Sequence, residues 1–204
     1  MSCAISPNRY RPLLPDSIRL LRLLPNGDEK APIQCQLFHY SLQKSGKPTH
    51  SYDALSYVWG GPDKPRFISI SEHNSTSRHD FPVTENLHEA LSRLRHRSIE
   101  RIIWVDAVCI DQENDREKEQ QIQFMAKIYG QANCVVAWLG KAADDSDRAL
   151  EEIRVAGGKE GTNVWDTAPV PQAVLALLQR PWFRRIWVWN RHLTTSAEIT
   201  NRSI

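Results

Sequence analysis

The stretch RIIWVDAVCIDQENDREKEQQ, residues 101–121, decides the fold class of this chain. Residues 101–110 are almost all apolar and rich in β-branched and aromatic types, which predicts a strand covered on both faces, as in a parallel sheet flanked by helices. A polar loop follows, and Asn114 with Glu117 three residues later resembles a capping box that begins the next helix. With the apolar run after that helix, these residues predict a βαβ unit with two parallel strands and a right-handed crossover.

The rest of the chain also divides into strands and helices of ordinary length. Pro25-Asn26-Gly27-Asp28 is a turn signal between two apolar runs, which predicts an amino-terminal antiparallel hairpin. The expected strands are 17–24, 33–40, 54–59, 67–70, 101–110, 134–139 and 182–189, and the expected helices are 85–97, 115–130, 146–156 and 171–179. We therefore expect a small α/β domain whose mainly parallel sheet is flanked by helices, with the hairpin added at the amino-terminal edge.

Composition is that of an ordinary globular protein. The chain has 204 residues, of which 41% are hydrophobic and 25% charged, enough to bury the core of one domain. The net charge of +2 is too small a surplus to indicate nucleic acid or an acidic membrane surface as a partner. Arg93, Arg95, His96 and Arg97 form the richest basic cluster, at a predicted helix end where cations complement the helix dipole. We favour that role over phosphate binding.

Cysteine usage and the amino terminus indicate a reducing compartment. The four cysteines are far apart and form no CxxC pair, so neither a zinc site nor a disulfide framework is expected. The chain begins MSCAISPNRYRPLLP, without the apolar core of a signal peptide, and no run approaches the ~20 apolar residues of a membrane span. We expect a cytoplasmic protein with no membrane span and no metal.

Polar residues gather after the predicted central strand. Asp106, Asp111 and Gln112 lie near its carboxyl end, where open α/β sheets bind ligands. For Asp111 we favour a structural role, a turn that hydrogen-bonds the backbone and caps the next helix, whereas for Asp106 both roles stay open. Glu117 and Lys118 follow in the first turn of that helix. Capping and the helix dipole explain Glu117, and a solvated ion pair with acidic neighbours explains Lys118.

Two further segments carry candidate residues. Tyr57 and Trp59 share one side of the strand that ends at Gly60, where Trp59 either packs in the core or stacks on a flat ligand. Neither GxGxxG nor GxxxxGK followed by Ser or Thr occurs, so Gly60 belongs to no phosphate loop of those kinds. Near the carboxyl end, Arg184 and Arg185 lie between apolar residues. One of them is expected to point outward, while the other could reach an acidic partner such as Asp106.

Three ordered blocks of the sequence resemble the fungal heterokaryon incompatibility domain. These are YDALSYVWG at 52–60, WVDAVCIDQ at 104–112 and RPWFRRIWV at 180–188. The central block continues with Glu117-Lys118, Gln121, Met125, Ile128-Tyr129 and VVAWLG at 135–140. The chain departs from the family at Asp111, where Asn is usual, and after Val188, where Trp189-Asn190-Arg191 replaces the usual Gln-Glu.

The resemblance implies a TIR-like, flavodoxin-like fold and an effector of fungal non-self recognition. Such an effector, once engaged by protein partners or by self-association, triggers incompatibility and programmed cell death. The domain would cover residues 16–190, between a flexible segment at 1–15 and an irregular tail at 191–204.

Two alternatives stay open beside the signalling role. One is hydrolysis, because TIR-like domains can cleave NAD as a substrate without a further cofactor. In that reaction Asp106 or Glu117 would stabilise an oxocarbenium-like transition state, and Trp59 or Tyr57 would stack on the base. The other is an incomplete, inactive and less stable domain, since the match to the family stops at Val188.

Overall fold

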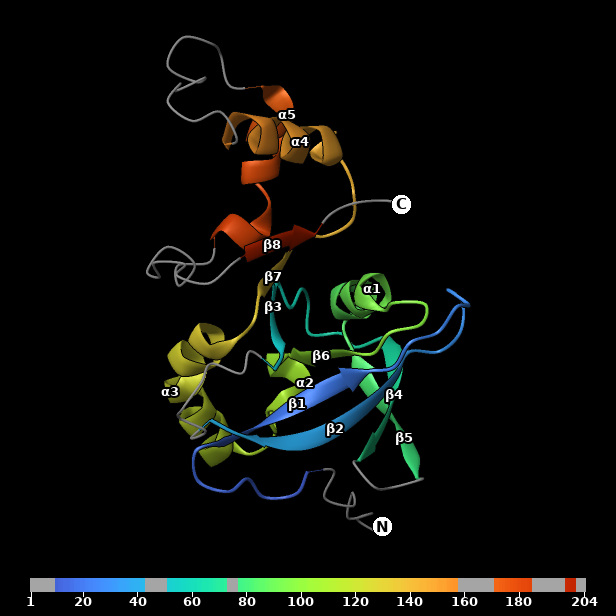
Figure 1. Ribbon diagram of the computed structural model, residues 1–204, viewed down its shortest axis with the longest axis vertical. Coiled ribbons are helices and arrows are strands. Elements are labelled where there is room, and N and C mark those ends of the chain that lie inside the picture. The colour runs from blue at the N-terminus through green and yellow to red at the C-terminus, as the bar shows by residue number, and fades with distance from the viewer. Residues whose placement is uncertain (1–9, 43–50, 73–76, 158–170, 185–196, 201–204) are drawn as a thin grey trace.

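The computed structural model describes residues 10–42, 51–72, 77–157, 171–184 and 197–200. Within these ranges, eight strands form one mixed sheet in the order β5-β4-β2-β1-β6-β3-β7-β8 (Figure 1). The strands are β1 Ser17–Leu23, β2 Gln34–Ser41, β3 Asp53–Tyr57, β4 Arg66–Glu72, β5 Arg78–Val83, β6 Arg101–Trp104, β7 Val135–Trp138 and β8 Ala197–Thr200. The helices are α1 Glu85–Leu94, α2 Asp106–Cys109, α3 Asp115–Gln131, α4 Ser146–Gly157, α5 Gln172–Leu178 and the 3-10 helix η1 Pro181–Arg184. The predicted α/β class is confirmed in this form, a mixed sheet with helices.

The amino-terminal hairpin is confirmed, but it lies inside the sheet. β1 and β2 pair antiparallel, from Ser17 with Ser41 to Leu23 with Cys35. β1 also pairs antiparallel with β6, and β2 pairs in parallel with β4, so neither strand is at an edge. The physical reason is that β1 buries side chains on both faces, which suits a strand in the interior of a sheet. The expected edge position is therefore wrong.

The central strand β6 is shorter than expected. It ends at Trp104, and the short helix α2 replaces the predicted continuation of the strand to residue 110. Cys109 N donates to Val105 O at 2.7 Å, so the backbone turns directly after the strand. Val108 and Cys109 are fully buried in α2. A short apolar run has the same appearance in sequence whether it is a buried strand or a buried helix, which explains the error.

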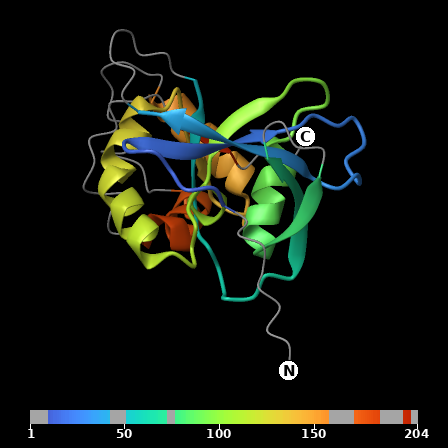
Figure 2. The ribbon, with the colours of Figure 1, turned by 90° about the horizontal axis from the view of Figure 1, so that it is seen from below.

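The two strands of the predicted βαβ unit, β6 and β7, are parallel as expected. β6 and β7 each pair in parallel with β3, which lies between them. Helix α3 connects them, and its N-cap Asn114 accepts a hydrogen bond from Glu117 N through its side chain. α3 and α1 lie well apart from each other in both views of the ribbon (Figure 1 and Figure 2).

A second, smaller core lies in the carboxyl-terminal part. Ala137 and Leu139 pack there with Ala149 of α4 and with Val174 and Leu177 of α5. Figure 1 shows α4 and α5 above β7 and β8, at the opposite end from the hairpin. The main core is formed by buried side chains of β1 to β7, of the short helix α2 and of the inner faces of α1 and α3.

Three observations concern the chain ends. The strand expected over 182–189 begins as the 3-10 helix η1, because Pro181 offers no N–H to a sheet and Phe183 N donates to Arg180 O. Residues 185–189 lie outside the described ranges. Strand β8 pairs in parallel with β7 within the tail expected to be irregular. Tyr10, within the segment expected to be flexible, donates from its hydroxyl to Val108 O at 3.0 Å.

In the part of the chain that the structure describes, no helix is both long enough and apolar enough to cross a bilayer.

Candidate functional site

Two strand ends meet at one edge of the sheet. β3 and β6 are parallel neighbours, so the residues that follow them emerge on the same side. These residues include Trp59 after β3 and Asp106 after β6, and Trp59 Nε1 donates to Asp106 Oδ2 at 2.9 Å. Open α/β sheets bind ligands beyond the carboxyl ends of their strands. The structure thus brings two of the predicted site residues into direct contact at the predicted edge.

Local hydrogen bonds hold Asp106 in place. Its Oδ1 accepts from Ala107 N at 2.7 Å, and its carbonyl oxygen accepts from Gln112 Nε2 at 2.8 Å. An ionised carboxylate can only accept hydrogen bonds, and both oxygens of Asp106 face N–H donors. Gln112, a third predicted residue, therefore fastens the loop after α2 to the same site.

The indole of Trp59 is the accessible part of this cluster. Trp59 is 41% exposed, whereas Tyr57 is 2% exposed and belongs to the core. Gly60 follows with φ of 82°, a left-handed conformation that glycine adopts without strain. The turn therefore presents Trp59 at the surface with its N–H on a carboxylate, where the ring face can stack on a flat ligand. Tyr57 is placed for packing.

Glu117 lies in a separate, structural cluster. Its carboxylate accepts from Arg19 Nη1 and Nη2 at 2.5 and 2.9 Å, and the side chains of Glu117 and Arg19 are only 10% and 1% exposed. Arg19 also donates to Cys109 O and Arg11 O. Burial alone would raise the pKa of Glu117, but hydrogen bonds from Arg19 and from Asp111 N outweigh burial and lower the pKa. This ionised carboxylate is suited to fastening β1 to the start of α3.

Asp111 and Lys118 have local partners. Asp111 Oδ1 accepts from Glu113 N at 3.1 Å, which is the turn contact that the sequence predicts for it. Lys118 Nζ lies 2.7 Å from Asp115 Oδ1 and 3.4 Å from Gln112 O. The side chain of Asp115 is 93% exposed, so this is the solvated ion pair expected of Lys118.

The carboxyl-terminal motif reaches β3 through Trp182. Its Nε1 lies 3.1 Å from Ser56 Oγ and 3.2 Å from Ser56 O, and sequence reasoning did not single out this contact. Arg184 is exposed at the end of η1, in the outward position expected for one of the two arginines. Arg185 lies outside the described residues, so its ion pair with Asp106 stays a prediction.

Asn86 is a further residue that sequence reasoning missed. Its Nδ2 donates to Val58 O at 2.6 Å, and its Oδ1 accepts from Trp138 Nε1 at 2.8 Å. These two bonds tie α1 to the ends of β3 and β7, directly before Trp59. The available signal was a polar residue in the first turn of an amphipathic helix, which does not identify a distant partner.

Neither a metal site nor a reactive thiol at Cys109 is supported in the described part of the chain. In those ranges, no three His, Cys, Asp or Glu side chains are grouped so that they could hold a metal ion. Burial raises the pKa of the Cys109 thiol to about 12, so this thiol is protonated at neutral pH and is not a nucleophile.

Comparison with known proteins assigns the family. Residues 52–190 match the family model described as heterokaryon incompatibility protein (HET). The chain belongs to this family. It is also 35% identical over 147 residues to "Heterokaryon incompatibility protein 6, OR allele" of Neurospora crassa, an alignment that covers 69% of the chain and 21% of that protein. The chain therefore spans about a fifth of the length of this curated relative. No solved structure is significantly similar to the chain.

The blocks that carry the resemblance meet in space in this heterokaryon incompatibility domain. The first block contains β3 and Trp59, and the central block contains Asp106 and Gln112. The last block begins with η1, whose Trp182 contacts β3. Segments more than a hundred residues apart in sequence thus converge at one edge of the sheet.

Proposed function

We propose that this heterokaryon incompatibility domain is a signalling effector of fungal non-self recognition that triggers programmed cell death when partner proteins or self-association engage it. The main observation behind this proposal is that Trp59, 41% exposed, is hydrogen-bonded to Asp106. The pair lies at the edge of the sheet where the three sequence blocks that resemble the family come together. The 35% identity to a protein named for heterokaryon incompatibility supports the same role. We further propose a cytoplasmic site of action.

The finer fold assignment is part of this proposal. We propose that the domain is TIR-like, and the parallel run from β6 through β3 to β7, with α3 as the connection, supports this relationship. The antiparallel strands β1 and β5 are additions to such a parallel unit. In this view the functional edge is the one that carries Trp59 and Asp106.

An enzymatic form of the same site is the second candidate. NAD cleavage needs a carboxylate beside an oxocarbenium-like transition state and a surface on which the base can stack. Asp106 next to the indole of Trp59 offers both groups within one hydrogen bond. Glu117 is the weaker candidate for the carboxylate, because Arg19 occupies both of its oxygens.

Inducible expression of the intact chain in a fungal host tests both candidates. Cell death and cellular NAD are measured together for the intact chain, for Asp106→Asn and for Trp59→Ala. Asp63→Asn is the matched control, since Asp63 is exposed in the loop after β3. The signalling proposal expects death with unchanged NAD, lost in both site variants and kept in the control.

Other outcomes separate the alternatives. Loss of NAD that Asp106→Asn abolishes, with abundance and fold retained, would favour the hydrolase over the signalling role. Absence of death from the intact chain would overturn the proposal and support the inactive-domain alternative.

A further inference from the structure

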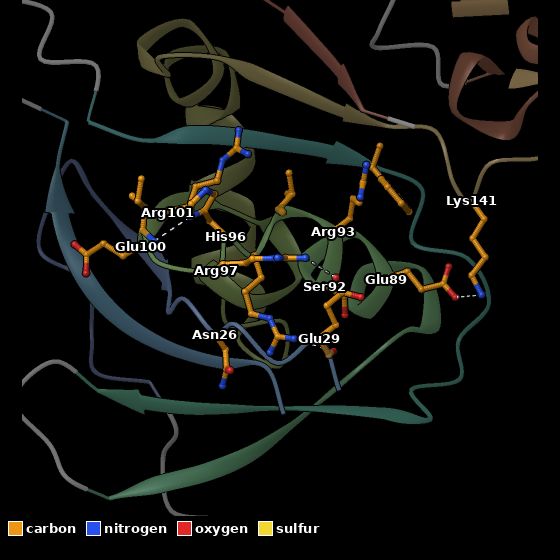
Figure 3. Close-up of a pocket in the computed structure, with 14 residues that line it drawn as sticks. Asn26, Glu29, Glu89, Ser92, Arg93, His96, Arg97, Glu100, Arg101 and Lys141 are labelled. Carbon is orange, nitrogen blue, oxygen red and sulfur yellow. Dashed lines mark hydrogen bonds and ion pairs between the residues drawn. The ribbon is translucent and has the colours of Figure 1, made fainter. Parts of the chain in front are cut away.

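A groove runs beside the carboxyl-terminal half of α1 (Figure 3). Its volume is about 930 Å³, at the upper end of the range for ligand pockets. Its walls come from α1, from the loop at 95–100, from the hairpin turn near Asn26 and from Trp138 and Lys141 at the end of β7. The Trp59–Asp106 pair does not line it, so the groove is a second candidate binding surface.

The groove contains the positive surplus of the chain. Its lining holds five cationic side chains and three carboxylates, a net charge of +2 with histidine neutral. The whole chain has the same net charge of +2, so the remainder of the chain is neutral in sum. The lining of this groove is thus positive in sum, which favours an anionic partner.

Two of the five cations are committed to the fold. Arg95 donates to the carbonyl oxygens of four residues in the hairpin turn, Asp28, Glu29, Ala31 and Pro32. Arg101 Nε donates to Asp53 Oδ2 at 2.8 Å, with both side chains largely buried. These two arginines shape the wall of the groove and are not available to a ligand.

The other three cations remain available. Arg93 is half-buried and makes no ion pair among the described residues. Arg97 Nη2 lies 3.6 Å from Glu29 Oε1, and both side chains are more than three-quarters exposed. The Arg97–Glu29 pair is therefore exposed on both sides, and such pairs are weak, so an incoming carboxylate can take the place of Glu29 at little cost. Lys141 pairs with Glu89, and the side chain of Lys141 is 72% exposed whereas that of Glu89 is 19% exposed. An ammonium has three N–H donors, so Lys141 can bind a second carboxylate while it keeps Glu89.

We propose that this groove docks an extended acidic segment of a partner protein, in which apolar side chains alternate with carboxylates. Arg93, Arg97 and Lys141 come from the helix, the loop and the end of β7, and Figure 3 shows them spaced along the groove instead of converging on one point. One small anion would engage a single cation, whereas an extended chain engages all three. Ile99, 63% exposed on the lining, offers contact to an apolar side chain of the segment.

Fluorescence anisotropy with the full chain tests this docking. The probe is a short fluorescein-labelled peptide in which glutamate alternates with leucine. We expect saturable binding that Arg93→Glu together with Arg97→Glu weakens about tenfold or more, since charge reversal turns attraction into repulsion. The matched control is Arg116→Glu together with Lys127→Glu on exposed positions of α3, with the same change in net charge and no expected loss. A peptide with lysine in place of glutamate should not bind.

Several results would overturn the docking proposal. These are equal weakening in the groove and control variants, no saturable binding of the acidic peptide, or tighter binding of a single-stranded RNA than of the peptide. Thermal unfolding by circular dichroism checks each fold, and the milder pair Arg93→Gln with Arg97→Gln should weaken binding in the same direction. Because binding is measured without cell death or NAD, failure here and failure of the proposed function are distinguishable.

Discussion

Removing the carboxylate of Glu117 should destabilise the fold far more than removing an exposed one. Glu117→Ala leaves Arg19, whose side chain is 1% exposed, without its bidentate partner. Breaking a buried pair from one side costs about 3–5 kcal/mol, because an uncompensated charge stays buried. Arg19 keeps its bonds to Cys109 O and Arg11 O, so we expect the lower part, about 3–4 kcal/mol. That is a large share of the ~5–15 kcal/mol by which domains are stable.

Urea denaturation followed by tryptophan fluorescence measures this loss, and thermal unfolding should show a fall of about 6–16 °C. The matched control is Glu85→Ala, which removes the first-turn carboxylate of an exposed pair with Arg66, and we expect a much smaller loss. A loss in Glu117→Ala no larger than in this control would refute the assignment of Glu117 as a structural residue.

The pH dependence of Glu117 has a definite sign. Its pKa is lowered in the fold from the ordinary value of 4.5, so the folded state binds its proton less readily than the unfolded chain. The stabilisation is fully present above the unfolded pKa and is lost as pH falls through the folded pKa. The difference in stability between the intact chain and Glu117→Gln should therefore stay constant from pH 7 to about 5 and shrink in more acidic solution.

Two further substitutions test the residues that hold the backbone on either side of Trp59. Asn86→Ala leaves the nearly buried Trp138 Nε1 and the Val58 carbonyl without their partner, which should cost about 1–3 kcal/mol in urea denaturation; an unchanged midpoint would contradict this. Gly60→Ala places a residue with a Cβ at a left-handed backbone position with φ of 82°, which should lower the free energy of unfolding by about 1–2 kcal/mol. Crowding is not the cause, since an added Cβ meets no atom within 4 Å. Gly61→Ala, equally uncrowded, is the control and should be nearly neutral, so equal losses at both positions would reject the conformational cause.

Local sequence patterns predicted the helices better than the ends of the strands. The helix expected over 85–97 is found as α1, and its buried residues Leu87, Ala90, Leu91 and Leu94 have the i, i+3, i+4, i+7 spacing of one helix face. Strand β6 was predicted too long because α2 continues the same apolar run in a buried helix. Periodicity alone does not distinguish the two over so few residues.

Contacts distant in sequence could not be predicted in the same way. Asn114 and Glu117 were predicted as a capping box. One of its two hydrogen bonds forms, from Glu117 N to Asn114 Oδ1 at 3.1 Å. The Glu117 carboxylate instead pairs with Arg19, 98 residues away, which no local pattern indicates. For Trp59 and Asp106 the sequence could predict only that the two residues lie near each other, because parallel strands end at a common edge. It could not predict their hydrogen bond.

We propose that the Trp59–Asp106 edge carries the activity, whereas the Arg19–Glu117 pair only supports the fold. Replacing a buried ion pair by apolar residues of similar volume is often neutral or stabilising, so Arg19→Met with Glu117→Met should fold. The most direct measurement is cell death in the fungal host at matched protein abundance. We predict that this double variant kills as the intact chain does, whereas Asp106→Asn does not. Death retained by Asp106→Asn and lost in the folded double variant would show that these two roles are assigned to the wrong pairs.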